Sequence, residues 1–188
     1  MELSPVKNLD LDDIKDEVWL DVFKYEDIYQ VSNRGRVKTK FRKMYYDRGL
    51  GRGKELKTVY PRIRKQKLNK HTGYLMIGLN SKGKATNYTI HSMVARAFIE
   101  NYKPEGTGKG RCTNHKDGNK LNNHVENLEV ITISENVRHM FKNGLTTNSH
   151  KVKYNGIEYY SKSEMRRVLK MPEKIQNKMI KEGSVEVL

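Results

Sequence analysis

The sequence predicts an α+β protein, extended and made of several small modules. Of its 188 residues, 36% are apolar and 31% charged, which is less apolar than a typical compact domain and disfavours one thick core. Strand and helix signals also fall into separate short groups along the chain. We expect a β-rich module at 1–40, a basic stretch at 41–73, a mixed strand-and-helix domain at 74–144, a linker at 145–151 and a C-terminal module at 152–188.

The overall charge points to a polyanionic partner. The chain carries a formal net charge of +15 and has a pI of about 9.8, which favours nucleic acid. No basic amphipathic helix or long apolar span is evident, so a membrane partner is not expected. The first 17 residues are acidic and lack the apolar run of a signal peptide. The single cysteine, Cys112, excludes an internal disulfide and fits a reducing, cytoplasmic setting.

The charge is unevenly distributed. Residues 1–33 hold nine acidic and three basic side chains, whereas residues 34–70 hold fifteen basic and two acidic ones. Such a run can be a solvated loop. Here, however, it is interleaved with aromatic residues and with glycines that allow close backbone approach, as expected of a segment lying along a phosphate backbone. The candidate DNA contacts within it are Arg62, Arg64, Lys65 and Lys67.

Two β-hairpins are expected before residue 91. Residues 17–40 are rich in β-formers around the turn signal Asn33-Arg34-Gly35, and we expect their aromatic residues to form that module's own core. Residues 73–79 and 85–90 form the second pair of β-rich runs, separated by a basic tip. A short helix should follow at 91–99, with His91 at its start or at the edge of the core rather than acting as a ligand.

Residues 111–144 predict a strand, a long loop, a second strand and a helix. The first strand ends at His115, and the loop after it is dense in turn-forming Asn, Asp and Gly. The second strand covers 128–132. Thr132 followed by Glu135 is a capping-box pattern, so a helix should begin there and stop near Gly144. Antiparallel pairing of the strands could bring His115 close to Asn136 in the first helical turn.

These residue types suit phosphodiester hydrolysis. An imidazole can take a proton from water near neutral pH, and a hard divalent cation with oxygen ligands can stabilise charge on the phosphate. Asn114 and Asn136 offer amide oxygens for such a cation, and Asn127 could hold the loop by side-chain hydrogen bonds. Each residue alone has an ordinary interpretation as a turn, cap or surface residue; their combination is much less expected by chance.

The motif Asn114-His115-Lys-Asp-Gly-Asn, with Asn127-Leu-Glu-Val-Ile-Thr and Glu135-Asn136 after it, resembles that of HNH homing endonucleases carried by phage introns and inteins. Residues 17–40 resemble the NUMOD4-like module that commonly precedes HNH in those proteins. The resemblance implies a ββα-metal nuclease core in which His115 is the general base and Asn127 the loop-holding residue. Asn114 and Asn136 would bind one divalent cation, Mg²⁺ or Mn²⁺.

The resemblance leaves three positions open. Close phage relatives that nick DNA often have aspartate where Asn114 stands, and an amide binds a divalent cation less tightly than a carboxylate, so metal affinity and choice are open. Asp117 could add an oxygen ligand, although a turn role fits its Asp-Gly sequence better. His139 could stand for the final histidine of the motif, but its spacing is ambiguous.

The C-terminal module should begin with a tiny hairpin around Asn155-Gly156 and continue with helices at 161–169 and 173–181. Two short helices can be a plain helical hairpin or a helix-turn-helix whose second helix enters a major groove. The position after an HNH motif resembles that of the DNA-binding repeat in the same homing enzymes, which favours the helix-turn-helix. Its candidate contacts are Lys174, Gln176, Asn177, Lys178 and Lys181.

The sequence therefore predicts a site-specific endonuclease acting on double-stranded DNA. With one HNH motif, we expect a monomer that nicks one strand and requires no protein partner. The main alternative is a non-catalytic DNA-binding regulator that retains the HNH fold as a scaffold, and a weaker one is a protein that binds structured RNA. The presence of His115 beside plausible metal ligands favours the enzyme.

Overall fold

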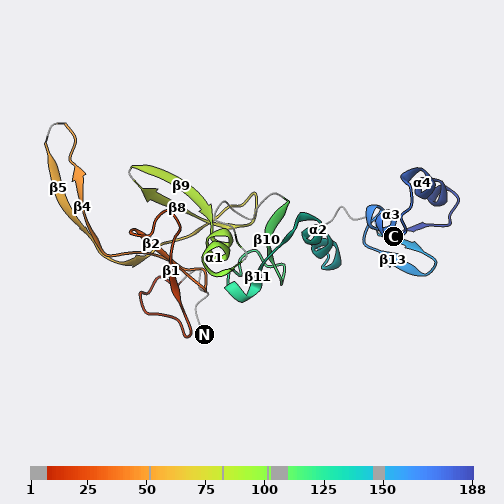
Figure 1. The fold of residues 1–188 in the computed structure, drawn as a ribbon, viewed down its shortest axis with the longest axis horizontal. Helices are drawn as coiled ribbons and strands as arrows, with labels where there is room; N and C mark the ends of the chain where they lie inside the picture. The colour runs from red at the N-terminus through yellow and green to blue at the C-terminus, as the bar shows by residue number, and fades with distance from the viewer. Residues whose placement is uncertain (1–7, 51, 82, 101, 103–109, 146–150) are drawn as a thin grey trace. The chain divides into compact units, whose positions relative to one another are not determined.

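The structure is a computed structural model that describes residues 8–50, 52–81, 83–100, 102, 110–145 and 151–188. The chain, drawn in Figure 1, separates into two compact units, Met1–Ile131 and Thr132–Leu188. Within the described part of the chain, no helix combines the length and the apolar character that a membrane crossing requires.

The first sheet of the first unit has four strands in the order β1-β2-β3-β6. Its members are β1 (Trp19–Asp21), β2 (Tyr29–Ser32), β3 (Val37–Thr39) and β6 (Arg62–Ile63). The predicted hairpin is confirmed: β2 and β3 are antiparallel, with Tyr29 opposite Thr39. Gly35 in the connecting turn has φ of +81°, a conformation that glycine adopts without steric cost.

The basic stretch contains a two-stranded ribbon, β4 (Arg42–Asp47) and β5 (Lys54–Val59), whose strands pair with each other. Figure 1 shows it as a long hairpin. The second predicted hairpin is also confirmed, as β8 (Leu75–Ser81) pairs with β9 (Lys84–Thr89), and β7 (Lys67–Leu68) adds a third strand. Helix α1 (Ile90–Phe98) follows directly, close to the expected 91–99.

The segment with the HNH-like motif begins with β10 (Arg111–His115), which lies beside β11 (Leu128–Thr132) in a two-stranded sheet. A short 3-10 turn, η1 (Val125–Asn127), leads into β11. Helix α2 (Ile133–Lys142) opens the second unit. The expected capping box is confirmed, because the Thr132 hydroxyl accepts from the Glu135 backbone while the Glu135 carboxylate accepts from Thr132.

One hydrophobic core joins the N-terminal sheet to later elements of the first unit, and this corrects the expectation that the aromatic residues of 17–40 form a core of their own. Tyr25 and Tyr29 belong to one buried cluster with Leu79 of β8, Val94 of α1 and Leu128 of β11. A few short strands cannot bury enough apolar surface alone. The N-terminal sheet therefore packs against β8, α1 and β11, the last of which pairs with the strand that carries His115.

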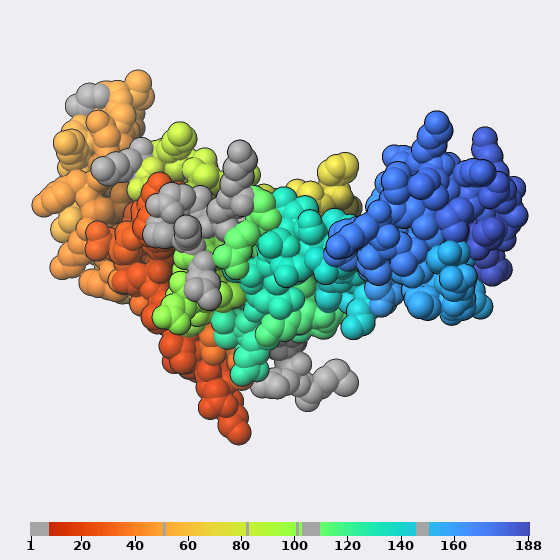
Figure 2. Space-filling view, turned by 45° about the vertical axis from the view of Figure 1, so that its right-hand side comes forward, coloured from red at the N-terminus to blue at the C-terminus, as the bar shows by residue number. Residues whose placement is uncertain are grey.

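The second unit contains its own small core after residue 151. Its strands are β12 (Val152–Tyr154), β13 (Ile157–Tyr159) and β14 (Glu186–Val187), and its helices are α3 (Lys162–Val168) and α4 (Glu173–Lys181). The predicted turn at Asn155-Gly156 is confirmed, with φ of +49° and +78°. Figure 2 shows these elements (blue) as one compact body. The sequence did not predict β14, a two-residue strand that pairs with β12.

The acidic N-terminal segment neutralises one arginine of the basic run by forming buried contacts with it. Arg36 is 1% exposed, forms an ion pair with Glu17, and donates to the backbone oxygens of Asp10 (2.7 Å) and Asp12 (2.9 Å). Burial opposes ionisation of Glu17, but hydrogen bonds from Arg36 and its neighbours hold its pKa below the usual value. Arg36 is therefore a structural residue, and the exposed basic surface of residues 34–70 is smaller than the sequence suggests.

Candidate active site

His115 is the last residue of β10 and is 5% exposed. Its Nε2 lies 3.2 Å from the side-chain oxygen of Asn123. The orientation of that side chain is set by its nitrogen, which donates to the Leu121 carbonyl oxygen at 3.3 Å. An amide oxygen can only accept, so Nε2 of a neutral His115 must carry the proton. The lone pair that can act as a base is then on Nδ1.

Aromatic rings surround His115. Tyr74 lies nearly parallel to it, with ring centroids 6.0 Å apart, and His91 meets it edge-on at 5.2 Å. Burial lowers the pKa of His115 below its ordinary value. Burial, with a further contribution from His115, lowers the pKa of His91 to about 4. Both imidazoles are therefore neutral at pH 7, as a general base must be.

Asn127 holds the loop that follows His115. Its side-chain oxygen accepts from the Asp117 backbone at 3.1 Å, and its nitrogen donates to the Asp117 carboxylate and to the Asn122 carbonyl oxygen, each at 2.9 Å. The backbone of Lys116 donates to the Asn127 carbonyl oxygen at 2.8 Å. These are the hydrogen bonds that a loop-holding residue would make.

Asp117 acts as the centre of this loop. Its carboxylate accepts from the Asn127 side chain, from the Asn119 backbone at 2.8 Å and from the Asn122 side chain at 2.8 Å. Burial would raise the pKa of Asp117, but these hydrogen bonds hold it below the usual value. With both oxygens engaged in the turn, Asp117 has the turn role that its Asp-Gly sequence favours.

Asn114 precedes His115 in β10 and is 5% exposed. Its side-chain nitrogen donates to the Glu129 carboxylate at 2.8 Å, which directs its oxygen the other way. An amide oxygen of this kind is a suitable ligand for Mg²⁺ or Mn²⁺. The described residues contain no group of three or more His, Cys, Asp or Glu side chains that could hold a metal by themselves. The donors present therefore fit a hard cation that keeps water or phosphate oxygens among its ligands.

The predicted partner ligand, Asn136, lies in the first turn of α2, in the second unit. His139 lies further along the same helix. The structure thus brings Asn114, His115 and Asn127 together, whereas the pairing of Asn114 with Asn136 stays a prediction.

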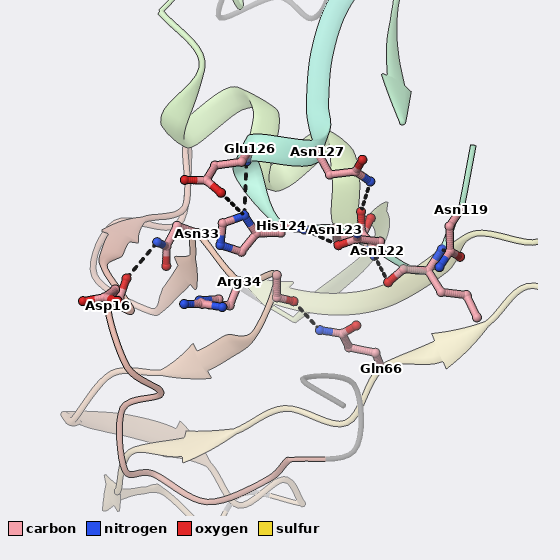
Figure 3. Close-up of a pocket in the computed structure, with 12 residues that line it drawn as sticks. Asp16, Asn33, Arg34, Gln66, Asn119, Asn122, Asn123, His124, Glu126 and Asn127 are labelled. Atoms are coloured by element: carbon pink, nitrogen blue, oxygen red, sulfur yellow. Dashed lines mark hydrogen bonds and ion pairs between the residues drawn. The ribbon is translucent and has the colours of Figure 1, made fainter. Parts of the chain in front are cut away.

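A groove of about 1070 Å³ lies beside the loop (Figure 3). Its walls are polar and include Asn33, Arg34 and Gln66 from the N-terminal half and Asn123 and Asn127 from the loop.

Gly35 lines the same groove and fixes how closely its two walls approach. A Cβ atom on Gly35 would lie 2.9 Å from Cβ of Asn123, so no larger residue fits without a shift. The Gln66 side chain donates to the Gly35 carbonyl oxygen at 2.6 Å. The Val125 backbone donates to the Asn33 carbonyl oxygen at 2.8 Å. The turn between β2 and β3 is therefore in direct contact with the loop that orients His115.

The candidate DNA contacts of the basic stretch differ in their availability. Arg62, Lys65 and Lys67 are exposed. Arg64 is half-buried; its guanidinium lies over the Tyr29 ring and within 3.4 Å of the Gly78 carbonyl oxygen. Arg64 is therefore partly committed to packing.

Helix α4 exposes four of its five candidate contacts. Lys174, Asn177, Lys178 and Lys181 are exposed and, with Ile175, line one shallow pocket. The prediction for Gln176 is wrong: it is 1% exposed and donates to the Lys162 carbonyl oxygen at 2.8 Å. It faces away from the exposed residues because it lies on the side of α4 that packs against α3, and it therefore joins the two helices.

Sequence reasoning missed Asn123, Tyr74 and Glu129 and did not place His91 beside His115. Asn123 had a usable signal, since it stands between His115 and Asn127 in a loop already expected to be held by amides. Tyr74 and His91 reach the site from elements outside the motif. Only the packing of β8 and α1 against the rest of the unit could reveal them.

Comparison with known proteins identifies two sequence motifs in this chain. Residues 17–80 match the NUMOD4 motif, and residues 113–138 match the HNH endonuclease family. The chain is 35% identical over 126 residues to DNA endonuclease I-HmuI of Bacillus phage SP01, which is 67% of this chain and 59% of that protein. It is 50% identical over 74 residues to the SPbeta prophage-derived YosQ of Bacillus subtilis (strain 168), or 39% of this chain and 40% of YosQ.

This chain thus covers less than two thirds of the length of both relatives. A solved structure of DNA binding and cleavage by the HNH homing endonuclease I-HmuI superposes with a TM-score of 0.50 at 29% identity, covering 89% of this chain and 91% of that one. The chain therefore carries an HNH endonuclease motif at residues 113–138, with a NUMOD4 motif ahead of it at residues 17–80.

Proposed function

We propose that the protein is a site-specific DNA endonuclease of the homing type, related to those of phage introns and inteins. It hydrolyses one phosphodiester bond with one divalent cation, Mg²⁺ or Mn²⁺, and as a monomer nicks one strand. The observation that carries the proposal is the buried, neutral His115, which directly follows the buried Asn114 in β10, within a segment that matches the HNH family. The relative I-HmuI is a DNA endonuclease that binds and cleaves DNA.

In the proposed reaction, Nδ1 of His115 takes the proton of the attacking water. The imidazolium that forms keeps its Nε2 hydrogen bond to Asn123, and the neutral oxygen of Asn123 stabilises it without raising the pKa as strongly as a carboxylate would. Asn114 and Asn136 would hold the cation. When bound, the cation would stabilise negative charge on the scissile phosphate and the leaving oxygen. Asn127 holds the loop so that His115 and Asn123 keep their geometry.

The substrate contacts are proposed for two surfaces. Arg62, Lys65 and Lys67 would contact phosphates, which gives affinity without sequence preference. In the second unit, α3 and α4 would form a helix-turn-helix, with α4 in the major groove. The exposed face of α4 suits this role because its lysine and asparagine side chains can reach phosphates and base edges.

The test is cleavage by the full chain of duplexes from its own genomic neighbourhood, with Mg²⁺ or Mn²⁺ and the ends mapped on each strand. The His115→Ala variant should lose cleavage by about 10²–10⁴-fold while its affinity for DNA stays within about twofold. The matched control is His71→Ala, because His71 is exposed and outside the motif segment. Breaks on both strands at equal rates would contradict nicking by a monomer. A wild-type chain that binds its DNA but cuts it with neither cation would favour the non-catalytic regulator.

A further inference from the structure

We propose that Glu129 is a positioning residue that fixes the amide of Asn114 with its oxygen toward the cation site and places a negative charge behind it. The inference rests on the proposed function, since it assigns a role at the proposed cation site. Glu129 lies on β11, beside β10, which carries Asn114. Their side chains are joined by a hydrogen bond of 2.8 Å from the Asn114 nitrogen to a Glu129 oxygen.

The direction of this hydrogen bond follows from chemistry. The two ends of an amide have almost the same shape, but only the oxygen can bind a cation. An ionised carboxylate only accepts hydrogen bonds, so Glu129 selects the orientation in which the Asn114 nitrogen faces it. Asn114 is 5% exposed, so solvent does little to compete for either end. Among the residues that the structure describes, Glu129 alone forms a hydrogen bond with the Asn114 side chain that distinguishes the two orientations.

The charge of Glu129 adds a second effect. Hydrogen bonds to a carboxylate are about twice as strong as neutral ones, and they polarise the donor group. Polarisation of the amide makes the Asn114 oxygen more negative, which strengthens it as a ligand. A neutral ligand thus gains part of the cation affinity that a carboxylate would provide directly.

The pair has a specific consequence for substitution. Asn114→Asp alone would set two carboxylates about 2.8 Å apart, and like charges at that distance repel strongly. The new carboxylate can be accommodated only if its partner can donate. Asn114→Asp combined with Glu129→Gln meets this condition, because it exchanges donor and acceptor while keeping one negative charge in the pair.

The experiment is calorimetric titration of the full chain with MnCl2, for the wild type, the two single variants and the double variant. Glu129→Gln should weaken Mn²⁺ binding by about 10-fold or more, and the double variant should bind at least as tightly as the wild type. Glu126→Gln is the control, because Glu126 is an exposed carboxylate three residues away. The proposal is overturned if Glu129→Gln changes the Kd by less than twofold, or if the effects of the two single variants simply multiply in the double variant.

A measurement without metal separates this proposal from the proposed function. In NMR spectra of the metal-free wild type, one side-chain NH proton of Asn114 should be shifted downfield and protected from exchange, and Glu129→Gln should abolish both features. An Asn114 signal that Glu129→Gln leaves unchanged overturns the positioning role. A wild-type chain that binds no Mn²⁺ contradicts the cation-dependent step of the proposed function, and the Asn114 signal then decides the orientation by itself.

Discussion

The side-chain oxygen of Asn123 lies 3.2 Å from Nε2 of His115, and the other end of the same amide is held by the Leu121 carbonyl oxygen at 3.3 Å. The His115 ring is therefore oriented by a neutral group whose own direction is fixed by the backbone of its loop. A neutral partner orients the ring and leaves the imidazole deprotonated over most of the neutral range.

The first prediction concerns the pH dependence of cleavage. Because burial lowers the pKa of His115, wild-type cleavage should lose half its kcat/KM at a pH below the ordinary histidine value of about 6.5. Asn123→Asp places a carboxylate against Nε2, which favours the imidazolium and should move that midpoint upward by about 1 pH unit or more. The measurement is kcat/KM from pH 5 to 8, with Asn123→Ala as the uncharged control. An acid limb that Asn123→Asp does not move would remove His115 as the titrating base.

The second prediction concerns stability and His91. The pKa of His91 is lowered to about 4 in the folded chain, whereas it is about 6.5 when unfolded. Between these values the unfolded state binds the proton and the folded state does not. The stability contributed by neutral His91 is therefore complete above pH 6.5 and is lost as the pH falls toward 4, by on the order of 3 kcal/mol.

Urea unfolding at pH 7, 6 and 5 tests this, comparing the wild type with His91→Phe, which cannot titrate. The variant should show a shallower loss of unfolding free energy on acidification. His71→Phe is the control, because His71 is exposed. Parallel curves for the wild type and His91→Phe would show that His91 is not the group responsible.

The third prediction concerns the loop. Asn127→Ala removes three side-chain hydrogen bonds, two exposed ones with Asp117 and a part-buried one to the Asn122 carbonyl oxygen. It should cost about 1–3 kcal/mol of unfolding free energy and increase hydrogen exchange at the Asp117 amide. Asn119→Ala is the control, since the Asn119 side chain makes one exposed hydrogen bond, to the Leu121 backbone. Equal losses for the two variants would argue against a special role for Asn127.

The fourth prediction separates affinity from discrimination. Changing Arg62, Lys65 and Lys67 together to Gln should weaken binding to target and scrambled duplexes alike, and should flatten the salt dependence by roughly 0.9 log units per lost phosphate contact. Changing Lys174, Asn177, Lys178 and Lys181 to Ala should instead reduce the preference for the target. Salt titrations of both variants on both duplexes provide the comparison. Unchanged discrimination in the α4 variant would contradict a recognition role for that helix.

The fifth prediction concerns the cation. Cleavage should cease in excess EDTA and return with added Mg²⁺ or Mn²⁺, and Asn136→Ala should raise the concentration needed for half-maximal cleavage. Ser134→Ala, two residues earlier in α2, is the matched control. Full cleavage in EDTA would contradict a metal-dependent mechanism.

The sequence predicted the local elements well, because turn chemistry and capping are encoded by adjacent residues. The turn at Asn155-Gly156, the capping box at Thr132 and the hairpin of β8 and β9 are examples. It failed where long-range packing decides. The burial of Gln176 against Lys162 depends on how α3 and α4 pack. The pairing of Arg36 with Glu17, which removes Arg36 from the exposed basic surface, depends on a contact between residues nineteen positions apart.

The same distinction applies within the candidate site. The segment with His115 and Asn127 could be identified because its residues follow one another at a recognisable spacing. Tyr74 and His91 could not be identified in this way. Tyr74 directly precedes β8 and His91 lies in α1, and both are brought to His115 only by the packing of the shared core. Glu129 stood within the motif, but its role became visible only through its contact with Asn114.

The contact between Gly35 and Asn123 has a consequence for how such proteins can be recombined. A turn of the NUMOD4-matching segment leaves no room for a side chain against the residue that orients His115. The two motifs are separate in the sequence, yet residues of both line the same groove. A chimera that joins this N-terminal segment to a foreign HNH motif would have to bring a compatible pair of residues at positions 35 and 123, so recombination between such genes should succeed more readily at junctions after residue 145 than between the two motifs.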